Sequence, residues 1–332
     1  MKSLDRKLAN IRAGRYTPQD FIIADAKDAD MAFGLMAPGP ARDDKGSQLD
    51  AVAPRDAYLG AMRAMTQSGL IDILLASASS IEILAQDRLF DNSAVTPAAR
   101  FNDTSDIWAP RGGRYGQEPS QPFRSARLEA LHPLVNLGLY SLTFSNDLTL
   151  DLRSLEAYSL FRAQAAALEL RHFLEVFNPA FDIGLQGDDI GPFIADSITR
   201  CLAGVLAAEH PLFLKLAYNG RAAMEQLASY DPARLVVGIL GGAKGTTRDT
   251  FELLHQAERA GARVALFGRK INYAEDPLTL VGLMRRVIAA EVTTVDAVRL
   301  YHEALSGQGI RPIRSLADDL EFSDALLKQE GA

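Results

Sequence analysis

The stretch LVVGILGGAKGTTRDTFELLHQAERAGARVALFGRK, residues 235–270, contains two short apolar runs on either side of a longer periodic segment. The runs LVVGIL (235–240) and RVALFG (263–268) have the length and composition of buried strands, and TFELLHQAERAG between them carries its apolar residues at helical spacing. A strand, a helix and a second strand in this order form the repeating unit of a parallel sheet.

The same alternation runs through most of the chain. Six further apolar runs are candidate strands, at residues 21–27, 71–77, 94–101, 138–145, 173–178 and 212–218. Eight β–α units in 332 residues predict the α/β class and a (β/α)8 TIM barrel, whose core needs about 250 residues. We therefore expect one barrel domain over residues 1–332. Pro97 is unfavourable in the third strand, because proline has no N–H for a central ladder.

Two segments lie outside the eight units. An insertion over residues 109–133, which begins with APRGGRYGQEPSQPFRSAR, follows the third strand and is expected at the catalytic face of the barrel. A mobile surface loop or a subunit contact explains its composition equally well. Residues 290–332 are expected to form a helical extension.

Composition excludes several classes of function. The net charge is −7 and no basic cluster is present, which argues against nucleic acid and anionic membranes as partners. Cys201 is the only cysteine and the five histidines are scattered, so we expect neither disulfides nor a metal site, and no cofactor is indicated. The sequence shows no signal peptide and no apolar run of about 20 residues. We expect a cytoplasmic protein that acts on a small molecule.

Two charged residues interrupt apolar strands near the middle of the chain. In LFLKLA (212–217) the leucines share one face, which directs Lys215 toward the barrel interior, and in HFLEVF (172–177) the same alternation directs Glu175 inward. Lys215 and Glu175 are therefore expected to meet on adjacent strands. A buried ion pair is the structural alternative to a catalytic role.

The first strand is predicted to add two more inward charges. In FIIADAK (21–27), Asp25 and Lys27 share a face with Phe21 and Ile23, and we take that face as the inner one. Burial and a nearby second cation both disfavour the ammonium form of a lysine. Lys215 is thus predicted to act as a Schiff-base nucleophile with Lys27 as the second cation, and Asp25 or Glu175 to transfer protons.

Glycine-rich loops follow the last two strands. GGAKGTT (241–247) and GRKINYAEDP (268–277) occupy the loops in which many barrels bind phosphate. Glycines let a phosphate approach the backbone closely, although they also serve tight turns. The predicted substrate-binding residues, including two asparagines at strand ends, are Gly241, Gly242, Lys244, Gly268, Arg269, Asn102 and Asn178.

From LKLAYNG to the GRKINYAEDP loop, the chain resembles the class I aldolases of the archaeal-type fructose-bisphosphate and LacD/DeoC-like superfamily. These are (β/α)8 barrels with a Schiff-base lysine on strand six, a GG-x-K turn after strand seven and a GR turn after strand eight. The resemblance implies a lysine iminium mechanism on a phosphorylated ketose or a related keto compound, with Lys215 as the nucleophile. It also places Asp25 at the position of a catalytic aspartate.

The chain departs from the family at two places. The family follows its aspartate with histidine and glycine, where this chain has Ala26 and Lys27, and it ends strand five with an acid/base tyrosine, where this chain has Phe177 and Asn178. In this chain Glu175 is the candidate to replace the tyrosine. Two alternatives stay open: a non-covalent sugar-phosphate isomerase or epimerase that uses Asp25 and Glu175, and a sugar-phosphate-sensing protein without turnover. We also expect a homo-oligomer.

Overall fold

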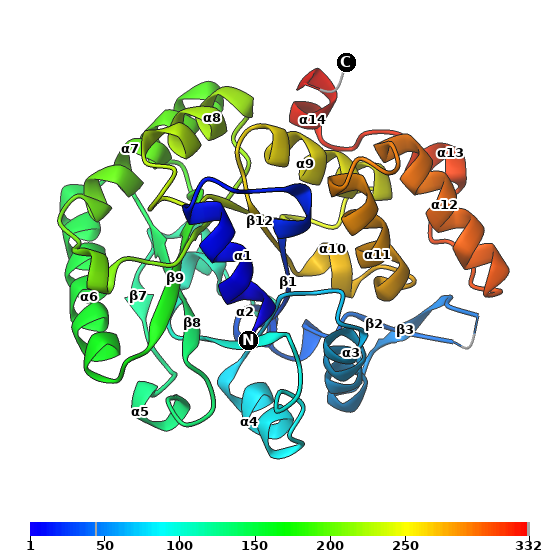
Figure 1. Ribbon diagram of the computed structural model, residues 1–332, viewed down its shortest axis with the longest axis horizontal. Helices are drawn as coiled ribbons and strands as arrows, with labels where there is room; N and C mark the ends of the chain where they lie inside the picture. The colour runs from blue at the N-terminus through cyan, green and yellow to red at the C-terminus, as the bar shows by residue number, and fades with distance from the viewer. Residues whose placement is uncertain (44, 331–332) are drawn as a thin grey trace.

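Eight parallel strands close into a barrel in the computed structural model, which describes residues 1–43 and 45–330 (Figure 1). All eight predicted strands and the (β/α)8 fold are confirmed. Around the barrel the strands are β1 (Ile22–Lys27), β4 (Ile73–Ala76), β5 (Thr96–Arg100), β8 (Leu137–Thr143), β9 (Arg171–Phe177), β10 (Leu214–Leu216), β11 (Gly238–Leu240) and β12 (Val264–Phe267).

Helices form the outer layer of the barrel. The longer ones are α3 (Arg55–Ser68), α4 (Ala78–Gln86), α6 (Leu148–Ala167), α7 (Ile190–Leu202), α8 (Arg221–Tyr230), α9 (Thr247–Arg259) and α11 (Pro277–Ile288). Short α-helices are α2 (Asp30–Phe33), α5 (Leu128–Leu131) and α10 (Arg269–Asn272). Local chemistry sets several starts: Thr246 and Asp249 form a capping box for α9, and Asp276 caps α11 ahead of Pro277.

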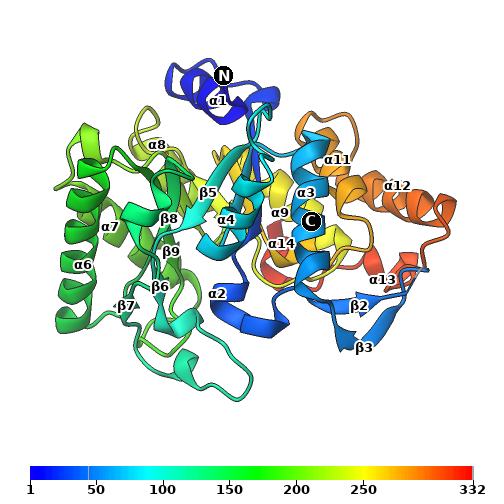
Figure 2. The ribbon, with the colours of Figure 1, turned by 90° about the horizontal axis from the view of Figure 1, so that it is seen from below.

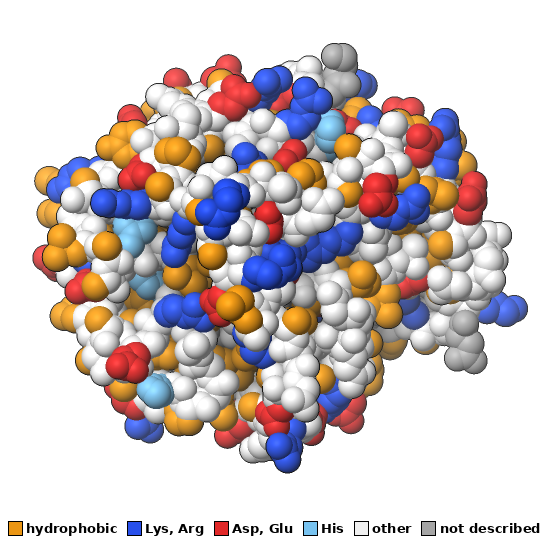
Figure 3. Space-filling view, in the orientation of Figure 1, with side chains coloured by type: hydrophobic (Ala, Val, Ile, Leu, Met, Phe, Trp, Pro, Cys, Tyr) orange, Lys and Arg blue, Asp and Glu red, His pale blue; other side chains and the backbone are white. Residues whose placement is uncertain are grey.

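The two ends of the barrel differ. Helix α1 (Ser3–Arg12) closes the amino-terminal end, where Leu4, Leu8 and Ile11 join the apolar cluster of the barrel interior. Figure 1 looks at this end, and Figure 3 shows Lys and Arg side chains in a strip across the centre of the same face. Figure 2 shows α2 and the β6–β7 ribbon on the side away from α1. The site described below therefore opens opposite α1.

Several smaller elements decorate the barrel. Two antiparallel ribbons pair β2 (Pro40–Arg42) with β3 (Gln48–Val52), and β6 (Asp103–Thr104) with β7 (Pro122–Phe123) within the segment that follows β5. After the eighth unit come α12 (Thr294–Gly307), α13 (Leu316–Asp319) and α14 (Ala325–Glu330). The 3-10 turns are η1 (Pro18–Asp20), η2 (Gly34–Met36), η3 (Ser105–Ile107), η4 (Tyr115–Gln117), η5 (Gly187–Asp189) and η6 (Ala207–Glu209). None of the described helices is both long and apolar enough to cross a membrane.

Pro97 lies inside β5 without breaking the barrel. Thr96 N–H donates to Asp72 O toward β4, whereas Phe101 N–H donates to Leu139 O toward β8. By alternation the nitrogen of Pro97 faces β8, and pairing with β8 begins only at Ala99. The proline therefore removes no ladder hydrogen bond.

A buried ion cluster ties the amino-terminal helix to the barrel wall. The Asp72 carboxylate lies 2.9 Å from Lys7 Nζ and 2.7 Å from Arg285 Nη2, and it accepts the backbone N–H of Ile23 at 2.9 Å. Burial alone would raise the pKa of Asp72, but Arg285 and Lys7 bring it below its ordinary value. This carboxylate links α1, β1, β4 and α11.

Asp72→Asn is expected to lower the free energy of unfolding by about 3–5 kcal/mol at neutral pH, because it leaves the buried Lys7 and the partly buried Arg285 without a counter-charge. The lowered pKa makes this stabilisation complete above about pH 4, with loss as the pH falls through the folded-state value. Urea unfolding between pH 7 and pH 3 measures it. Asp87→Asn, which breaks the exposed Arg63–Asp87 pair, is the control and should cost about 1 kcal/mol or less. Equal effects of the two variants would contradict the assignment.

Candidate active site

Lys215 and Glu175 meet inside the barrel, as predicted from strand alternation. Their Cα atoms are register partners on β10 and β9, and Ser141 on β8 is the partner of Glu175 on its other side. Leu214 and Leu216 face the helix layer. Three consecutive strands thus present Ser141, Glu175 and Lys215 at one level.

The carboxylate of Glu175 is the centre of a hydrogen-bonded network. Its Oε1 lies 2.6 Å from Lys215 Nζ, and its Oε2 accepts from Arg100 Nη2 at 3.1 Å and from Ser141 Oγ at 3.0 Å. Arg100 donates from Nη1 to Ser141 Oγ at 2.9 Å and from Nε to Asp28 Oδ2 at 2.6 Å. Five side chains from four strands and the β1–α2 loop therefore form one continuous network.

The four charges of this network balance in a nearly dry environment. Glu175 is 1% exposed and Lys215 5% exposed, and Asp28 and Arg100 are also buried. Burial would raise the pKa of Asp28, but Arg100 and Lys215 hold it below its ordinary value. Burial would lower the pKa of Arg100, but Asp28 and Glu175 raise it. Asp28 is thus a carboxylate, and the network joins two acidic side chains to two basic ones.

A pocket of about 240 Å³ opens above this network at the carboxyl ends of the strands. Lys215, Glu175, Asp28 and Arg100 line it together with Gly241, Gly242, Gly268 and Arg269 from the loops after β11 and β12, and with apolar side chains that include Ile107, Phe177 and Leu240. The described lining residues include no tyrosine. The pocket has the size and the polar floor for a small molecule.

The prediction that Asp25 and Lys27 point into the barrel is wrong. Ile22, Ala24 and Ala26 form the inner face of β1, whereas Phe21 and Ile23 pack outward against the helices. Asp25 and Lys27 share the outward face. The small alanines fit the crowded interior, and the bulkier residues fill the wider space beneath the helix layer.

Asp25 and Lys27 form a fully buried pair behind the strand. Lys27 Nζ lies 3.3 Å from Asp25 Oδ1, donates to Asn272 Oδ1 at 2.8 Å and sits 5.9 Å from the ring centre of Tyr58. Burial raises the pKa of Asp25 and lowers that of Lys27. The second cation near Lys215 is therefore Arg100, and Lys27 does not serve in that role.

The double variant Asp25→Asn/Lys27→Met is expected to react with keto compounds at a rate within about threefold of wild type, because it removes a buried pair as a unit and leaves the pocket intact. Covalent trapping with borohydride, described below, measures the rate, and Lys215→Met is the unreactive control. A tenfold loss of the trapping rate at unchanged thermal stability would contradict this prediction and would indicate that Asp25 or Lys27 takes part in the reaction.

Sequence reasoning missed Asp28, Arg100 and Ser141. Arg100 shares the inward face of β5 with Ala98, and it is a charge at the end of an apolar run, which is the same signal that identified Lys215. Asp28 lies one residue past the end of β1 and continues the alternation of Ala24 and Ala26, three residues beyond the aspartate that was predicted. Ser141 carries no signal of its own, since serine is common in strands that end near water.

The glycine loops reach the pocket as expected. Gly242 has a φ of +65°, and a Cβ on Gly268 would lie 2.9 Å from Ala26 O, so both positions favour glycine. Among the described residues, no acceptor pairs with the backbone N–H of Gly242 or Arg269. Together with the Arg269 guanidinium, these groups are free to bind an anion.

Three of the predicted substrate-binding residues do not line the pocket. Lys244 Nζ donates to Tyr273 O at 2.6 Å, and Asn102 bonds the backbone N and O of Ser141. Asn178 pairs reciprocally with Asn219. Each side chain joins neighbouring segments and none of the three lines the pocket, so their contact with substrate stays a prediction.

Within the described residues, no group of three or more His, Cys, Asp or Glu side chains is arranged to hold a metal ion. The site as it stands consists of an amine, two carboxylates, a guanidinium and a hydroxyl. These groups can form a covalent bond to a carbonyl and move protons.

No protein-family model matches the chain, and no curated protein sequence matches it. Several solved structures are similar to the chain. An archaeal fructose-1,6-bisphosphate aldolase with its catalytic lysine bound to the carbinolamine intermediate has 16% identity and a TM-score of 0.62 over 86% of this chain and 99% of that one. The fructose-bisphosphate aldolase of Slackia heliotrinireducens has 14% identity and a TM-score of 0.63 over 92% of each chain.

A third match is a Corynebacterium glutamicum protein, with 18% identity and a TM-score of 0.57 over 88% of this chain and 99% of that one. At these identities the likeness establishes the fold. The chain has the TIM-barrel fold found in Schiff-base aldolases.

Proposed function

We propose that the protein is a class I aldolase, a carbon–carbon lyase that forms a Schiff base between Lys215 and a phosphorylated ketose or related keto compound. One observation carries the proposal: Lys215 Nζ lies 2.6 Å from the buried Glu175 carboxylate at the floor of a pocket whose rim is formed by the glycine loops. The shared fold with aldolases that use a catalytic lysine supports it.

Covalent attachment begins with a proton transfer. Glu175 accepts a proton from the Lys215 amine, and the free amine attacks the substrate carbonyl carbon to form a carbinolamine. Glu175 then returns the proton to the carbinolamine hydroxyl, which leaves as water, and a positively charged iminium remains. Since the iminium takes the place of the ammonium and Glu175 is again a carboxylate, the net charge of the network is the same before and after attachment.

Bond cleavage needs a second base. The iminium withdraws the electron pair of the bond between its α and β carbons, while a carboxylate removes the proton from the hydroxyl on the β carbon. Asp28 fits this role, because Arg100 and Lys215 keep it ionised and it lines the pocket. An aldehyde leaves, the enamine takes up a proton at carbon, and water hydrolyses the iminium to release the keto product.

The glycine loops supply the proposed anion site. Gly241, Gly242, Gly268 and Arg269 line the same pocket as Lys215, so a phosphate bound there would direct the carbonyl of the same molecule toward the amine. Arg269 adds a guanidinium whose planar fork suits phosphate oxygens. The homo-oligomer and the cytoplasmic location stay predictions.

The test is the mass of the intact protein after incubation with dihydroxyacetone phosphate and a panel of keto sugar phosphates, with and without borohydride. A stable mass increase only with borohydride is the expected result, and the reactive compounds define the substrate class. Thermal stabilisation by a compound that never forms an adduct would overturn the proposal. Turnover by Lys215→Arg would then favour the isomerase, and binding without turnover the sensing protein.

A further inference from the structure

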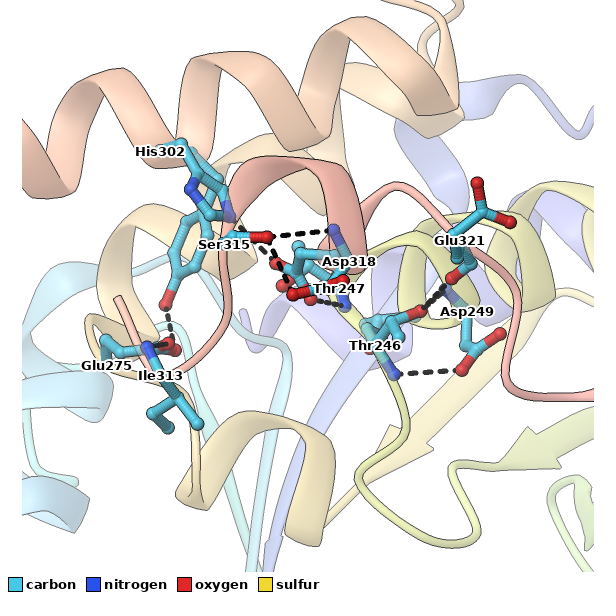
Figure 4. Close-up of polar contacts among 12 residues, drawn as sticks. Thr246, Thr247, Asp249, Glu275, His302, Ile313, Ser315, Asp318 and Glu321 are labelled. Carbon is cyan, nitrogen blue, oxygen red and sulfur yellow. Dashed lines mark hydrogen bonds and ion pairs between the residues drawn. The ribbon is translucent and has the colours of Figure 1, made fainter. Parts of the chain in front are cut away.

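The segment after α12 contacts the loops that follow β10, β11 and β12, and the last two of these loops line the pocket. We call residues 313–330 the C-terminal strap. Figure 4 shows its contacts with the loop after β11 and with Glu275, which follows β12. The buried side chains of Asp249 and Asp319 lie at the centre of these contacts, so buried hydrogen bonds attach the strap to the barrel.

Asp249 joins the strap to the glycine loop. Its Oδ2 accepts from Thr246 N at 2.9 Å and from the Ser323 hydroxyl, and its Oδ1 accepts from Ser323 N at 3.1 Å and Asp324 N at 3.3 Å. Thr246 Oγ1 in turn donates to Glu321 O at 2.9 Å. A Cβ on Gly245 would lie 2.5 Å from Asp249 Oδ2, so the loop is packed directly on this carboxylate.

A second carboxylate repeats the connection at the next residue. Asp319 of the strap accepts the backbone N–H of Thr247 at 2.8 Å and lies 3.0 Å from His302 Nε2 on α12. Ile313 N donates to Glu275 at 2.8 Å, and Glu275 lies 3.8 Å from Lys244 Nζ in the glycine loop. The loop is thus held at its middle and at its end.

The far end of the strap reaches the loop that follows Lys215. Glu330 accepts from the Tyr218 hydroxyl at 2.5 Å and from Arg221 N at 2.7 Å, and Leu327 O accepts from Gln256 at 3.0 Å. Tyr218 is three residues beyond Lys215. The strap therefore connects the nucleophile's strand with the proposed anion site.

We propose that the strap is a positioning element that fixes the loop of residues 241–247 for phosphate binding, with Asp249 as its main positioning residue. This inference rests on the proposed function for the nature of the ligand. Ordering the loop before binding lowers the entropy cost of ligand capture, so the strap should govern the affinity for the phosphate more than the chemistry at Lys215. Neither Asp249 nor Ser323 lines the pocket.

Two readouts in the 332-residue chain test the proposal. Amide hydrogen exchange reports the order of residues 241–247 without any ligand. Covalent trapping with borohydride gives the half-saturating concentrations of dihydroxyacetone phosphate and of dihydroxyacetone, which lacks the phosphate. Ser323→Ala removes the hydroxyl that donates to Asp249, and Asp249→Asn weakens all four contacts of the carboxylate. The control Thr293→Ala removes a capping hydroxyl at the start of α12 whose partner among the described residues is Asp296.

Ser323→Ala is expected to raise the exchange rates of the loop amides and the half-saturating concentration of dihydroxyacetone phosphate by about 3- to 10-fold, the loss typical of one hydrogen bond. Asp249→Asn should raise both the exchange rates and the half-saturating concentration by more than Ser323→Ala does. The value for dihydroxyacetone and the trapping rate at saturation should stay unchanged, and Thr293→Ala should match wild type in every readout.

Unchanged loop exchange in both Ser323→Ala and Asp249→Asn would overturn the inference, as would equal losses for the two trapping compounds. If Asp249→Asn fails to fold, Ser323→Ala decides alone. Absence of any adduct in wild type would contradict the proposed function, whereas the exchange measurement would still decide whether the strap orders the loop.

Discussion

Lys215→Met is expected to abolish covalent trapping and to lower the rate of carbon–carbon cleavage by at least about 10⁴-fold, because Lys215 carries the one amine among the described residues that line the pocket. Methionine keeps much of the lysine stem's volume, and Glu175 retains Arg100 and Ser141 as partners. The fold should therefore survive. Steady-state cleavage of a compound that traps on wild type, together with thermal unfolding, measures both expectations.

Lys45→Met is the matched control, since Lys45 is an exposed lysine at the β2–β3 turn. It should behave as wild type in trapping, cleavage and unfolding. Cleavage by Lys215→Met within tenfold of wild type would contradict the covalent mechanism and favour a reaction that needs only the carboxylates.

Glu175→Gln is expected to lower the single-turnover trapping rate by about 10²- to 10⁴-fold, the range for loss of a general acid–base group. Glutamine has nearly the same shape, but it cannot accept the proton of the Lys215 amine. It also leaves Arg100 and Lys215 short of a counter-charge, so the free energy of unfolding should fall by about 3–5 kcal/mol. Rapid-quench trapping and urea unfolding separate the two effects.

The control for Glu175→Gln is Glu225→Gln, which removes a carboxylate from an exposed pair with Arg221. That variant should trap at the wild-type rate. If Glu175→Gln traps at a rate within threefold of wild type, Glu175 is not the proton-transfer group, and Asp28 becomes the candidate.

The barrel and its central pair were predictable from the sequence because the signals are local. On β9 and β10, large aliphatic residues alternate with other types, and that alternation fixes which face meets the helices. β1 lacks this contrast: its inner face is Ile22, Ala24 and Ala26, and its outer face includes Phe21 and Ile23. Hydrophobicity alone does not separate these two faces, and this led to the wrong placement of Asp25 and Lys27.

The rest of the site depends on contacts between distant segments. Arg100 pairs with Asp28 and Glu175, which lie 72 and 75 residues away in the sequence. Lys244 is in the expected loop, but its long side chain turns to Tyr273 O and away from the pocket. The strap meets Asp249 from 74 residues away. The spacing of residues in the sequence predicts single helices and strands, and it does not predict contacts between side chains of distant segments.

The measurement that tests the central claim most directly is peptide mapping of the borohydride-reduced adduct formed by wild type with dihydroxyacetone phosphate. Two other lysines make this informative, because burial lowers the pKa of Lys244 and of Lys270 to about 8, which makes both competent nucleophiles. The account predicts that the label lies on Lys215 alone. A label on Lys244 or Lys270, with Lys215 unmodified, would contradict it.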